Sequence, residues 1–561
     1  MKKLFFLTMV LLLVGAFALP AAAVPVADLT TLAGYFPEGS VIYASVRTDD
    51  DFVGTLDGLL QRVPEIGGLS LTSSLDTVAS GIKSGATFQD LFRPWLGDTA
   101  AFGLLPLTTM DEFRNPVALI AISLTDREAA EAFFQSVTRP RDYEQTQGDG
   151  FTTYESTRDN THLAFRDDVL LIASSFDAIA AGGAVTAALS AAEPFTTAIS
   201  QLPGADYNAV IYIDSPTILE FTQSQLENVG PSEIAILQAL DDVSPQVFGF
   251  TIVDGSSLTI DAVTAATGEA LNVTGGMTTP LDLGIVSRLP AGTPLVILGT
   301  NFADSYTAAL AQIEPLLAMQ GTDADMAQFE TGLWLIELFV RGLTGLDLQR
   351  EILPALNGTY AIYAGVNPAA EGADTAFDLV SPELLLDFAL TFNVTDAATA
   401  AQLRDNLNTI LGDLPTERID NLDIAFEEVN GTPVIVFSVE TDPFSGDQIE
   451  FVLAVTDEIF TVGTRRYVEA ALNPGVGLDQ DPQWQAAAQY FVADSYSLLY
   501  QSSANLAPLV GIFARTGSSD TRDISQVLGL VTGLVDNSSI SYGRLGETGV
   551  QMRAVLTLSS D

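Results

Sequence analysis

The sequence of 561 residues contains no cysteine and only one histidine. Without cysteine, the chain can form no disulfide, offers no thiolate nucleophile and builds no cysteine-ligated zinc site. The histidine, His162, lies in the stretch DNTHLAF, which we interpret as a strand edge after a turn. Because no G-x-S-x-G elbow accompanies it, we predict no catalytic role for His162. One histidine without cysteine also argues against an ordinary zinc site.

Positive charge is scarce as well. The sequence has 23 Lys and Arg residues against 71 Asp and Glu residues, a formal net charge of −48 at pH 7. Such a surface repels phosphate backbones and anionic headgroups, so we predict no nucleic-acid partner. The acidic residues can keep a rather apolar protein in solution, and calcium binding is the alternative interpretation.

The calcium alternative depends on two clusters of hard oxygen ligands. Asp49–Asp51 form the first, and Asp479 with Asp481 form the second. Neither cluster has the spacing of an EF-hand loop, and acidic residues at the first cluster also suit the start of a helix. We therefore predict no cofactor, with a structural calcium ion as the alternative.

A long apolar run occurs only near the N-terminus. Lys2 and Lys3 precede an almost wholly apolar stretch over residues 4–19, and Ala21–Ala23 follow it. This is the layout of a secretory signal peptide, so we predict that residues 1–23 are cleaved. An uncleaved anchor is the alternative, but the run is shorter than the roughly 20 residues that span a bilayer. We expect no membrane span after cleavage and an extracytoplasmic location, whether secreted, periplasmic or at the cell surface.

The sequence also contains an internal likeness. YFPEGSVIYASVRTDDDF, from Tyr35 to Phe52, is similar to RLPAGTPLVILGTNFADSY, from Arg288 to Tyr306. Further pairs follow in the same order, such as LTDREAAEAF with VTDAATAAQL and AFRDDVLLIAS with AVTDEIFTVGT. We predict a tandem duplication of two similar halves, residues 24–275 and 276–561, since so long a period indicates duplicated domains. The alternative is that any two halves of alternating strands and helices look alike.

Each half is predicted to be α+β. QMRAVLTL alternates apolar and polar side chains, which is typical of a strand with one covered face. HLAFRDDVLLIAS and FVLAVTDEIFTVGT each hold two strands joined by a loop so short that only an antiparallel hairpin fits. Thr125 and Glu128 form a capping-box pattern ahead of an amphipathic helix. We predict roughly eight mostly antiparallel strands per half, with helices packed on the sheet.

One apolar segment suggests a binding role. LWLIELFVRGL, from Leu333 to Leu343, is apolar nearly all round its helix. A helix of this kind is usually buried, so central core is one interpretation. The alternative is that it lines an apolar cavity or contacts another protein, and the candidate residues are then Leu333, Trp334, Ile336, Phe339 and Val340.

Three stretches carry a resemblance to a known family. The opening FPEGSVIYASVRTDD, the stretch WLGDTAAFG and the hairpin FRDDVLLIAS resemble the uncharacterised bacterial exported proteins grouped as domain of unknown function 3352. The resemblance implies a bacterial source and an extracytoplasmic location, but no activity, ligand or site residues.

Together these features predict an exported, soluble, non-enzymatic protein that serves as a binding or cell-envelope interaction module. Its partner would be a protein of unknown kind or an apolar ligand. A carrier of a lipid or other apolar ligand is one alternative. A secreted hydrolase that uses paired carboxylates is another, although the sequence marks out no catalytic residue.

Overall fold

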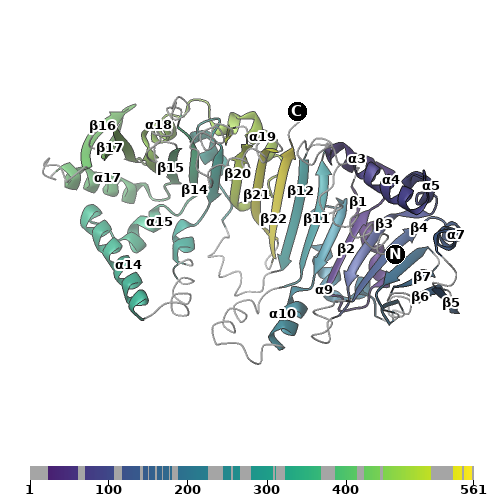
Figure 1. Ribbon diagram of the computed structural model, residues 1–561. Coiled ribbons are helices and arrows are strands. Elements are labelled where there is room, and N and C mark those ends of the chain that lie inside the picture. The colour runs from purple at the N-terminus through teal and green to yellow at the C-terminus, as the bar shows by residue number, and fades with distance from the viewer. Residues whose placement is uncertain are drawn as a thin grey trace. The chain divides into compact units, whose positions relative to one another are not determined.

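The structure is a computed structural model of the chain (Figure 1). It describes residues 23–60, 70–106, 117–138, 143–148, 151–157, 161–166, 168–175, 177–179, 187–224, 244–253, 257–265, 279–307, 310, 323–367, 386–412, 422–442, 447–503, 505–506, 535–545 and 549–558. Nearly all of the predicted signal peptide and the predicted boundary between the halves at residues 275 and 276 lie outside the described residues.

The chain divides into two compact units. Unit 1 comprises residues 1–267, 545–554 and 558–561, and unit 2 comprises residues 268–544 and 555–557. Both units mix helices with a large sheet, and the strand pairs given below are all antiparallel. The predicted α+β class with mostly antiparallel sheets is therefore confirmed.

The sheet of unit 1 starts at an edge hairpin and ends near the C-terminal part of the unit. Its pairing order is β5 (Tyr143–Gly148), β6 (Phe151–Ser156), β7 (His162–Arg166), β8 (Val169–Ala173), β4 (Ala118–Leu124), β3 (Leu96–Leu104), β2 (Ile42–Arg47), β10 (Ala209–Ile213), β11 (Gln246–Val253) and β12 (Ser257–Ala265). The short strands β1 (Val24–Pro25) and β9 (Asp206–Tyr207) pair separately. The predicted β7–β8 hairpin is confirmed, whereas roughly eight strands was an underestimate.

The sheet of unit 2 has the same plan. Its pairing order is β16 (Leu422–Val429), β17 (Thr432–Asp442), β18 (Asp447–Val455), β19 (Ile459–Thr464), β15 (Leu386–Asn393), β14 (Tyr360–Val366), β13 (Leu295–Gly299), β20 (Ser495–Ser502) and β21 (Val535–Leu545). The last strand of the chain is β22 (Gly549–Leu558), whose residues up to Ala554 belong to unit 1. Counted along the chain within each unit, these nine strands pair in the order of the first nine strands of unit 1. The predicted hairpin at Asp457–Glu458 is β18–β19 and is confirmed.

Helices pack on both faces of the unit 1 sheet. One face carries α2 (Val26–Thr30), η1 (Thr31–Tyr35), η4 (Leu189–Ala191) and α9 (Glu193–Ser200), which share a core with buried strand residues such as Tyr43. The other face carries α3 (Asp50–Leu60), α4 (Leu71–Ile82), α5 (Phe88–Leu91) and α7 (Arg127–Val137) over a second core. Helix α10 (Ser215–Ser224) follows β10.

Unit 2 is layered in the same way. We call one face of its sheet the α18 face, because η5 (Leu283–Arg288), α18 (Arg465–Leu472), η8 (Leu478–Gln480) and α19 (Pro482–Ala488) pack there. The other is the α17 face, where α17 (Ala397–Gly412) packs together with α14 (Asp323–Thr344), η6 (Leu348–Ile352) and α15 (Leu353–Ala355). No helix among the described residues is long and apolar enough to cross a membrane.

Acidic side chains start the two helices that follow β4 and β15. Asp126 accepts a hydrogen bond from the backbone N–H of Ala129 at 2.9 Å, and Asp396 accepts one from the N–H of Ala398 at 3.0 Å. A carboxylate at this position satisfies backbone donors that the first turn leaves open. The capping box predicted at Thr125 is therefore wrong, since α7 begins one residue later, at the Asp126 cap.

The turns that precede β2 and β13 have the same backbone form. Gly39 has a φ of 85° and Gly292 a φ of 76°, a left-handed conformation that glycine adopts at little cost. Pro37 makes an isolated bridge with Ala188, and Pro290 makes one with Gly477. The similar stretches that open the two halves in the sequence thus fold into similar turns.

Candidate binding surface

Large apolar side chains are exposed almost only in unit 2. Among the described residues, all but one of the exposed large apolar side chains belong to unit 2, and the exception is Val137 at the end of α7. Those of unit 2 are Leu283, Ile297, Trp334, Leu335, Leu338, Ile362, Phe388, Phe426 and Val476. Two groups of them lie on regular secondary structure close in sequence register and form the candidate surface.

The first group lies on the α17 face of the sheet, and we call it the open sheet face. It consists of Ile297 on β13, Ile362 on β14 and Phe388 on β15, which are 36–42% exposed. Ile297 and Ile362 are directly opposite each other in register, and Phe388 is opposite Ala364, two residues along β14 from Ile362. Side chains at alternate positions share one face of a strand, so these three project to the same side.

Unit 1 has smaller or better covered residues at the same places in its pairing order. Ala44 on β2 is opposite Phe102 on β3, and Ala118 lies on β4 two residues before Ile120, which is opposite Phe102. Ala44, Phe102 and Ala118 are all half-buried, and Phe102 packs against the core beneath α4 and α7. The exposed apolar face is thus a property of unit 2 and not a requirement of the fold.

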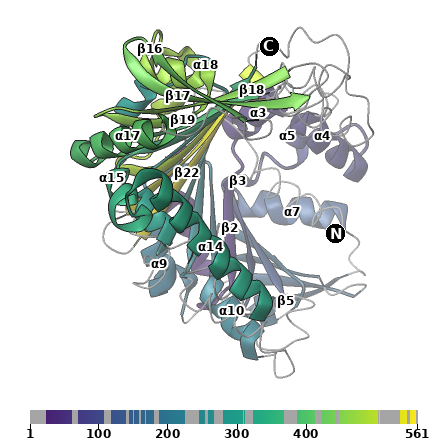
Figure 2. The same cartoon turned by 90° about the vertical axis from the view of Figure 1, so that its left-hand side faces the viewer.

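The second group lies on α14, which Figure 2 shows along its length. Trp334 is 58% exposed, and Leu335 and Leu338 are each 51% exposed. The interpretation of this segment as central core is therefore wrong for these three residues. The alternative, a helix that contacts something else, is compatible with their exposure.

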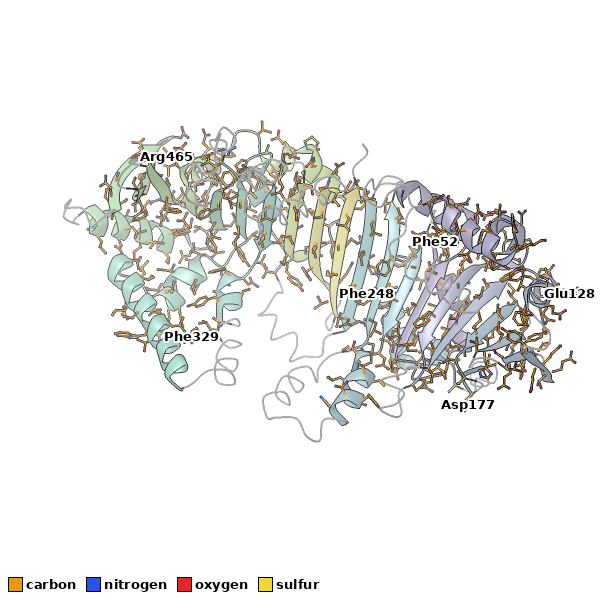
Figure 3. All side chains as sticks on the ribbon, in the orientation of Figure 1. Phe52, Glu128, Asp177, Phe248, Phe329 and Arg465 are labelled. Atoms are coloured by element: carbon orange, nitrogen blue, oxygen red, sulfur yellow. The ribbon has the colours of Figure 1, made fainter. Side chains whose placement is uncertain are left out.

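The remaining predicted residues of α14 lie on its covered side or outside the described side chains. Leu333 is half-buried, as is Phe329 one turn earlier, which is labelled in Figure 3. Val340 is half-buried and packs against the core beneath α17. Ile336 and Phe339 belong to the helix, but their side chains lie outside the described ones.

A groove separates α14 from η6. It is lined by three apolar and three charged side chains: Trp334, Glu337, Leu338, Arg341, Asp347 and Leu348. Glu337 accepts a hydrogen bond from the Nε2 of Gln349, and Asp347 accepts one from the backbone N–H of Arg350 at 3.0 Å. Burial, and then the nearby Glu337 carboxylate, raise the pKa of the Tyr306 hydroxyl above its ordinary value. The groove therefore combines an exposed indole with negative charge.

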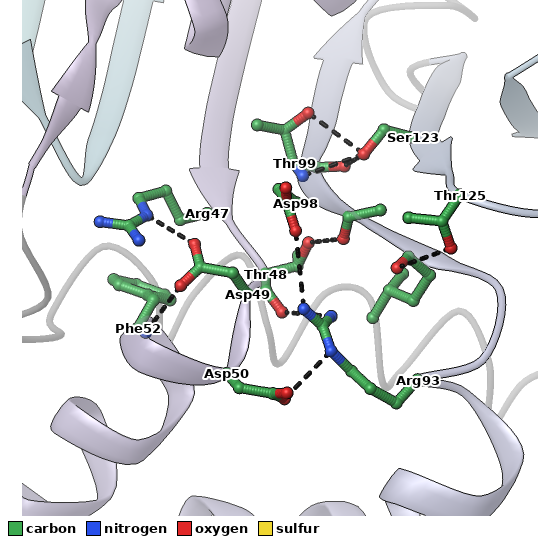
Figure 4. A network of polar contacts seen from close by, with 12 residues as sticks. Arg47, Thr48, Asp49, Asp50, Phe52, Arg93, Asp98, Thr99, Ser123 and Thr125 are labelled. Atoms are coloured by element: carbon green, nitrogen blue, oxygen red, sulfur yellow. Dashed lines mark hydrogen bonds and ion pairs between the residues drawn. The ribbon is translucent and has the colours of Figure 1, made fainter.

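The acidic cluster at Asp49–Asp51 is engaged by arginines (Figure 4). The Nε of Arg47 lies 2.6 Å from the Oδ2 of Asp49, whose Oδ1 accepts the backbone N–H of Phe52 at 3.0 Å. The Nε of Arg93 lies 3.0 Å from the Oδ1 of Asp50. These contacts fasten the start of α3 to the end of β2. Sequence reasoning missed them, because Arg93 is far from Asp50 along the chain.

The second acidic cluster is used for capping. The Oδ1 of Asp481 accepts the backbone N–H groups of Gln483 and Trp484, and its Oδ2 accepts the N–H of Gly292 at 3.0 Å. Asp479 lies in η8. Within the described residues, no three His, Cys, Asp or Glu side chains are placed so that they could hold a metal ion.

His162 lies on β7 and is buried. Its Nδ1 is 3.9 Å from the Oε1 of Glu155 on the neighbouring strand β6. The position is inside the sheet and not at a strand edge, because β7 pairs with β6 on one side and β8 on the other. The prediction of a strand edge at His162 is therefore wrong.

One protein family matches the chain. A family model described as "Protein of unknown function (DUF3352)" matches residues 77–501, from within α4 to within β20. The chain belongs to this family. The DUF3352 match includes strands of both units, and it confirms the resemblance found in the sequence. Neither the curated proteins nor the solved structures contain a match to this chain. The description of DUF3352 states no role, so the function is argued from the surface.

Proposed function

We propose that this chain is an exported, non-enzymatic binding module whose second unit provides the surface that contacts a partner. The observation that carries the proposal is the concentration of exposed large apolar side chains in unit 2. Contiguous exposed apolar patches are uncommon on proteins that act alone, and they usually mark interaction sites. Unit 1 then acts as a scaffold.

The comparison between the units supports this assignment. Both have the same strand order, but unit 1 places Ala44 and Ala118 where unit 2 places Ile297 and Phe388. Keeping large apolar side chains exposed does nothing for the stability of unit 2 itself, since burial is what makes them stabilising. A contact with another molecule gives these residues a purpose.

We also infer that the two units arose by tandem duplication, with halves at residues 24–275 and 276–561. Beyond the shared strand order, a ring contact recurs. Phe195 on α9 meets Tyr212 edge-on, with centroids 5.0 Å apart, and Trp484 on α19 meets Tyr500 edge-on at 4.9 Å. Such a repeated detail is hard to obtain from two unrelated α+β halves.

The partner of the open sheet face is best described as a protein. A pocket for a small molecule encloses most of the surface of its ligand. An open sheet face can cover only one side of a lipid chain, whereas a protein partner brings its own surface to cover the rest. The groove beside α14 is also half charged, which suits a protein better than a lipid chain.

Export and the lack of a cofactor belong to the same proposal. Residues 1–23 have the pattern of a signal peptide, and the mature chain would work outside the cytoplasm. Arginines and backbone N–H groups already engage Asp49, Asp50 and Asp481, which supports a module without a metal cofactor. N-terminal sequencing of protein recovered outside the cytoplasm should begin near Val24. Recovery of a product that retains residues 1–23 would contradict cleavage.

A photo-cross-linking experiment tests the binding surface. A photoreactive phenylalanine analogue is placed at Ile362 in unit 2 or, as matched control, at Val137 in unit 1, which are 42% and 41% exposed. Irradiation of cells that produce the protein should give a discrete protein adduct from position 362 and none from position 137. An adduct of small mass would favour a carrier of an apolar ligand. Equal yields from both positions, or no adduct from either, would refute the proposed binding surface.

A further inference from the structure

We propose that α14 presents a helix-docking seam, and that its occupant is an amphipathic helix of a partner protein with a basic polar side. The seam consists of Thr331, Leu335, Leu338 and Gly342, all of them exposed. We call this set the α14 seam. The inference deepens the proposed function, because it names the chemistry of one partner contact in unit 2.

The spacing of the α14 seam matches helix-on-helix packing. Its members follow one another at intervals of four, three and four residues, which places them in one stripe along the helix. A stripe with this alternation faces a second helix in the packing that also forms coiled coils. The opposite side of α14 is already occupied, since Val340 packs against the core beneath α17 and Thr344 is buried. The seam is therefore a second packing side of the same helix.

Gly342 gives the seam a feature that unit 2 itself does not use. A Cβ atom added at Gly342 would meet nothing within 4 Å. Glycine weakens the middle of a helix relative to alanine, so a glycine there needs a reason outside the helix. One turn after Leu338, the missing side chain leaves a notch where the backbone of a partner helix can approach closely. Small residues at both ends of the seam, with two leucines between them, fit this contact.

The flanks of the α14 seam define the chemistry of the partner. Trp334 lies beside Leu335 with its ring largely exposed, and large aromatic residues dominate the energetics of many interfaces. Glu337 and Asp347 line the adjoining groove with Arg341, and the whole chain has a formal charge of −48. Charge complementarity therefore favours lysine and arginine on the flanks of the partner helix. The same charge disfavours a second copy of this chain and an anionic membrane.

Unit 1 lacks this feature at the corresponding place. Helix α4 lies between β2 and β3 as α14 lies between β13 and β14. It has 12 residues against 22 in α14, and its apolar residues Leu71, Leu75 and Ala79 are all buried. Unit 2 has thus lengthened the helix and put apolar residues on its outer side.

A peptide titration of the full-length protein tests the seam. The probe is a synthetic peptide of three heptads, about 21 residues, with leucine at the a and d positions and lysine at e and g. Its control has the same composition, with the leucines placed out of register. Trp334 is the exposed tryptophan among three, so its emission should shift to shorter wavelength on binding. The in-register peptide should bind, and the control should not.

Matched variants separate the seam from general attraction to an acidic, apolar surface. Leu335→Glu with Leu338→Glu should weaken peptide binding at least about tenfold. Phe426→Glu with Val476→Glu adds the same two charges at other exposed apolar positions of unit 2 and should leave binding unchanged. Equal binding by both double variants would overturn the seam. Circular dichroism confirms that each variant is folded.

Gly342→Leu distinguishes failure of the seam from failure of the proposed function. Filling the notch makes the surface more apolar, yet it should weaken peptide binding by about fivefold or more, because the partner backbone can no longer approach. Stronger binding would show a general apolar surface, which overturns the seam and leaves the proposed function standing. Self-association of the protein that Leu335→Glu abolishes, or binding to vesicles of anionic phospholipid in place of the peptide, would overturn the proposed occupant.

Discussion

The pair formed by Arg553 and Asp261 should be the most sensitive polar contact of unit 1. Arg553 on β22 and Asp261 on β12 both belong to that unit. The Nε of Arg553 lies 2.6 Å from Oδ1 of Asp261, and its Nη2 lies 2.9 Å from Oδ2. The carboxylate is buried, and its Oδ2 also accepts the hydroxyl of Tyr207 at 2.9 Å. We predict that Arg553→Met strongly destabilises unit 1.

The magnitude follows from the burial of Asp261. Removing the guanidinium takes both charged donors from a carboxylate that water does not reach. Breaking a buried ion pair on one side costs about 3–5 kcal/mol, because the remaining charge is left uncompensated. At about 2 °C per kcal/mol for a unit of this size, the melting temperature should fall by about 6–10 °C. Asp261→Asn in addition to Arg553→Met removes the stranded charge, so the double variant should regain at least half of the loss.

Denaturant and thermal unfolding, followed by circular dichroism, measure these differences. Arg404→Met is the matched control, because Arg404 pairs with Asp457 at 3.2 Å on the surface, where an ion pair contributes at most about 1 kcal/mol. The deficit of Arg553→Met should narrow as the pH falls toward 4, since a carboxylate that has lost its cation can take up a proton. The reasoning is refuted if Arg553→Met is no less stable than Arg404→Met, or if the double variant is as unstable as the single one.

Three further predictions test burial and packing. Trp334 is 58% exposed and the other two tryptophans are each 4% exposed, so Trp334→Phe should remove most of the acrylamide-quenchable emission; unchanged quenching would contradict the exposure of α14. Burial raises the pKa of Tyr363 to about 12. The unfolded state releases this proton near pH 10 while the folded state keeps it, so stability should fall from pH 10 to 12 by about 3 kcal/mol at most. Tyr363→Phe should flatten that part of the profile in urea titrations, and an identical profile would show that other groups cause the loss. Gly249→Ala and Gly342→Ala should shift thermal melts in opposite directions: a Cβ at Gly249 would collide with the ring of Tyr207, whereas Gly342 has open space and should gain about 0.5–1 kcal/mol. A stabilising Gly249→Ala would be incompatible with the packing of β11.

Hairpins were the part of the fold that local sequence could predict. Strands β7 and β8, and likewise β18 and β19, are separated by so few residues that no parallel crossover can connect them. The pairing of Arg166 with Val169 and of Val455 with Phe460 confirms both hairpins. Here the covalent chain alone restricts the geometry, so no knowledge of the rest of the fold is needed.

Edge strands and helix starts were less accessible. Strand β5 reads YEQTQG, which lacks the apolar alternation by which a strand is recognised, yet it pairs with β6 over its full length. The start of α7 was placed at Thr125, but the N–H of that residue bonds to the carbonyl of Trp95 at 2.9 Å, and Asp126 becomes the cap. Both residue types can cap a helix. A contact with a distant strand end decided between them.

The candidate surface shows the limit of periodicity. A helix that is apolar nearly all round is usually buried, and on that basis α14 was a candidate for the core. The structure covers the side that carries Val340 and leaves Trp334, Leu335 and Leu338 exposed. The sequence pointed to the correct segment, since the neighbouring Trp334 was among its candidates, but Leu335 and Leu338 were not.

By itself, the amino-acid sequence determined the α+β class, the hairpins, the acidic balance and the family, because each depends on composition or on residues a few positions apart. The tertiary structure alone decided which apolar residues are core and which are surface. Leu75 and Leu338 are both leucines on helices that occupy corresponding places, and one is buried while the other is half in solvent. Burial is a property of what packs over a side chain, and the residues that do so are brought there from distant parts of the chain.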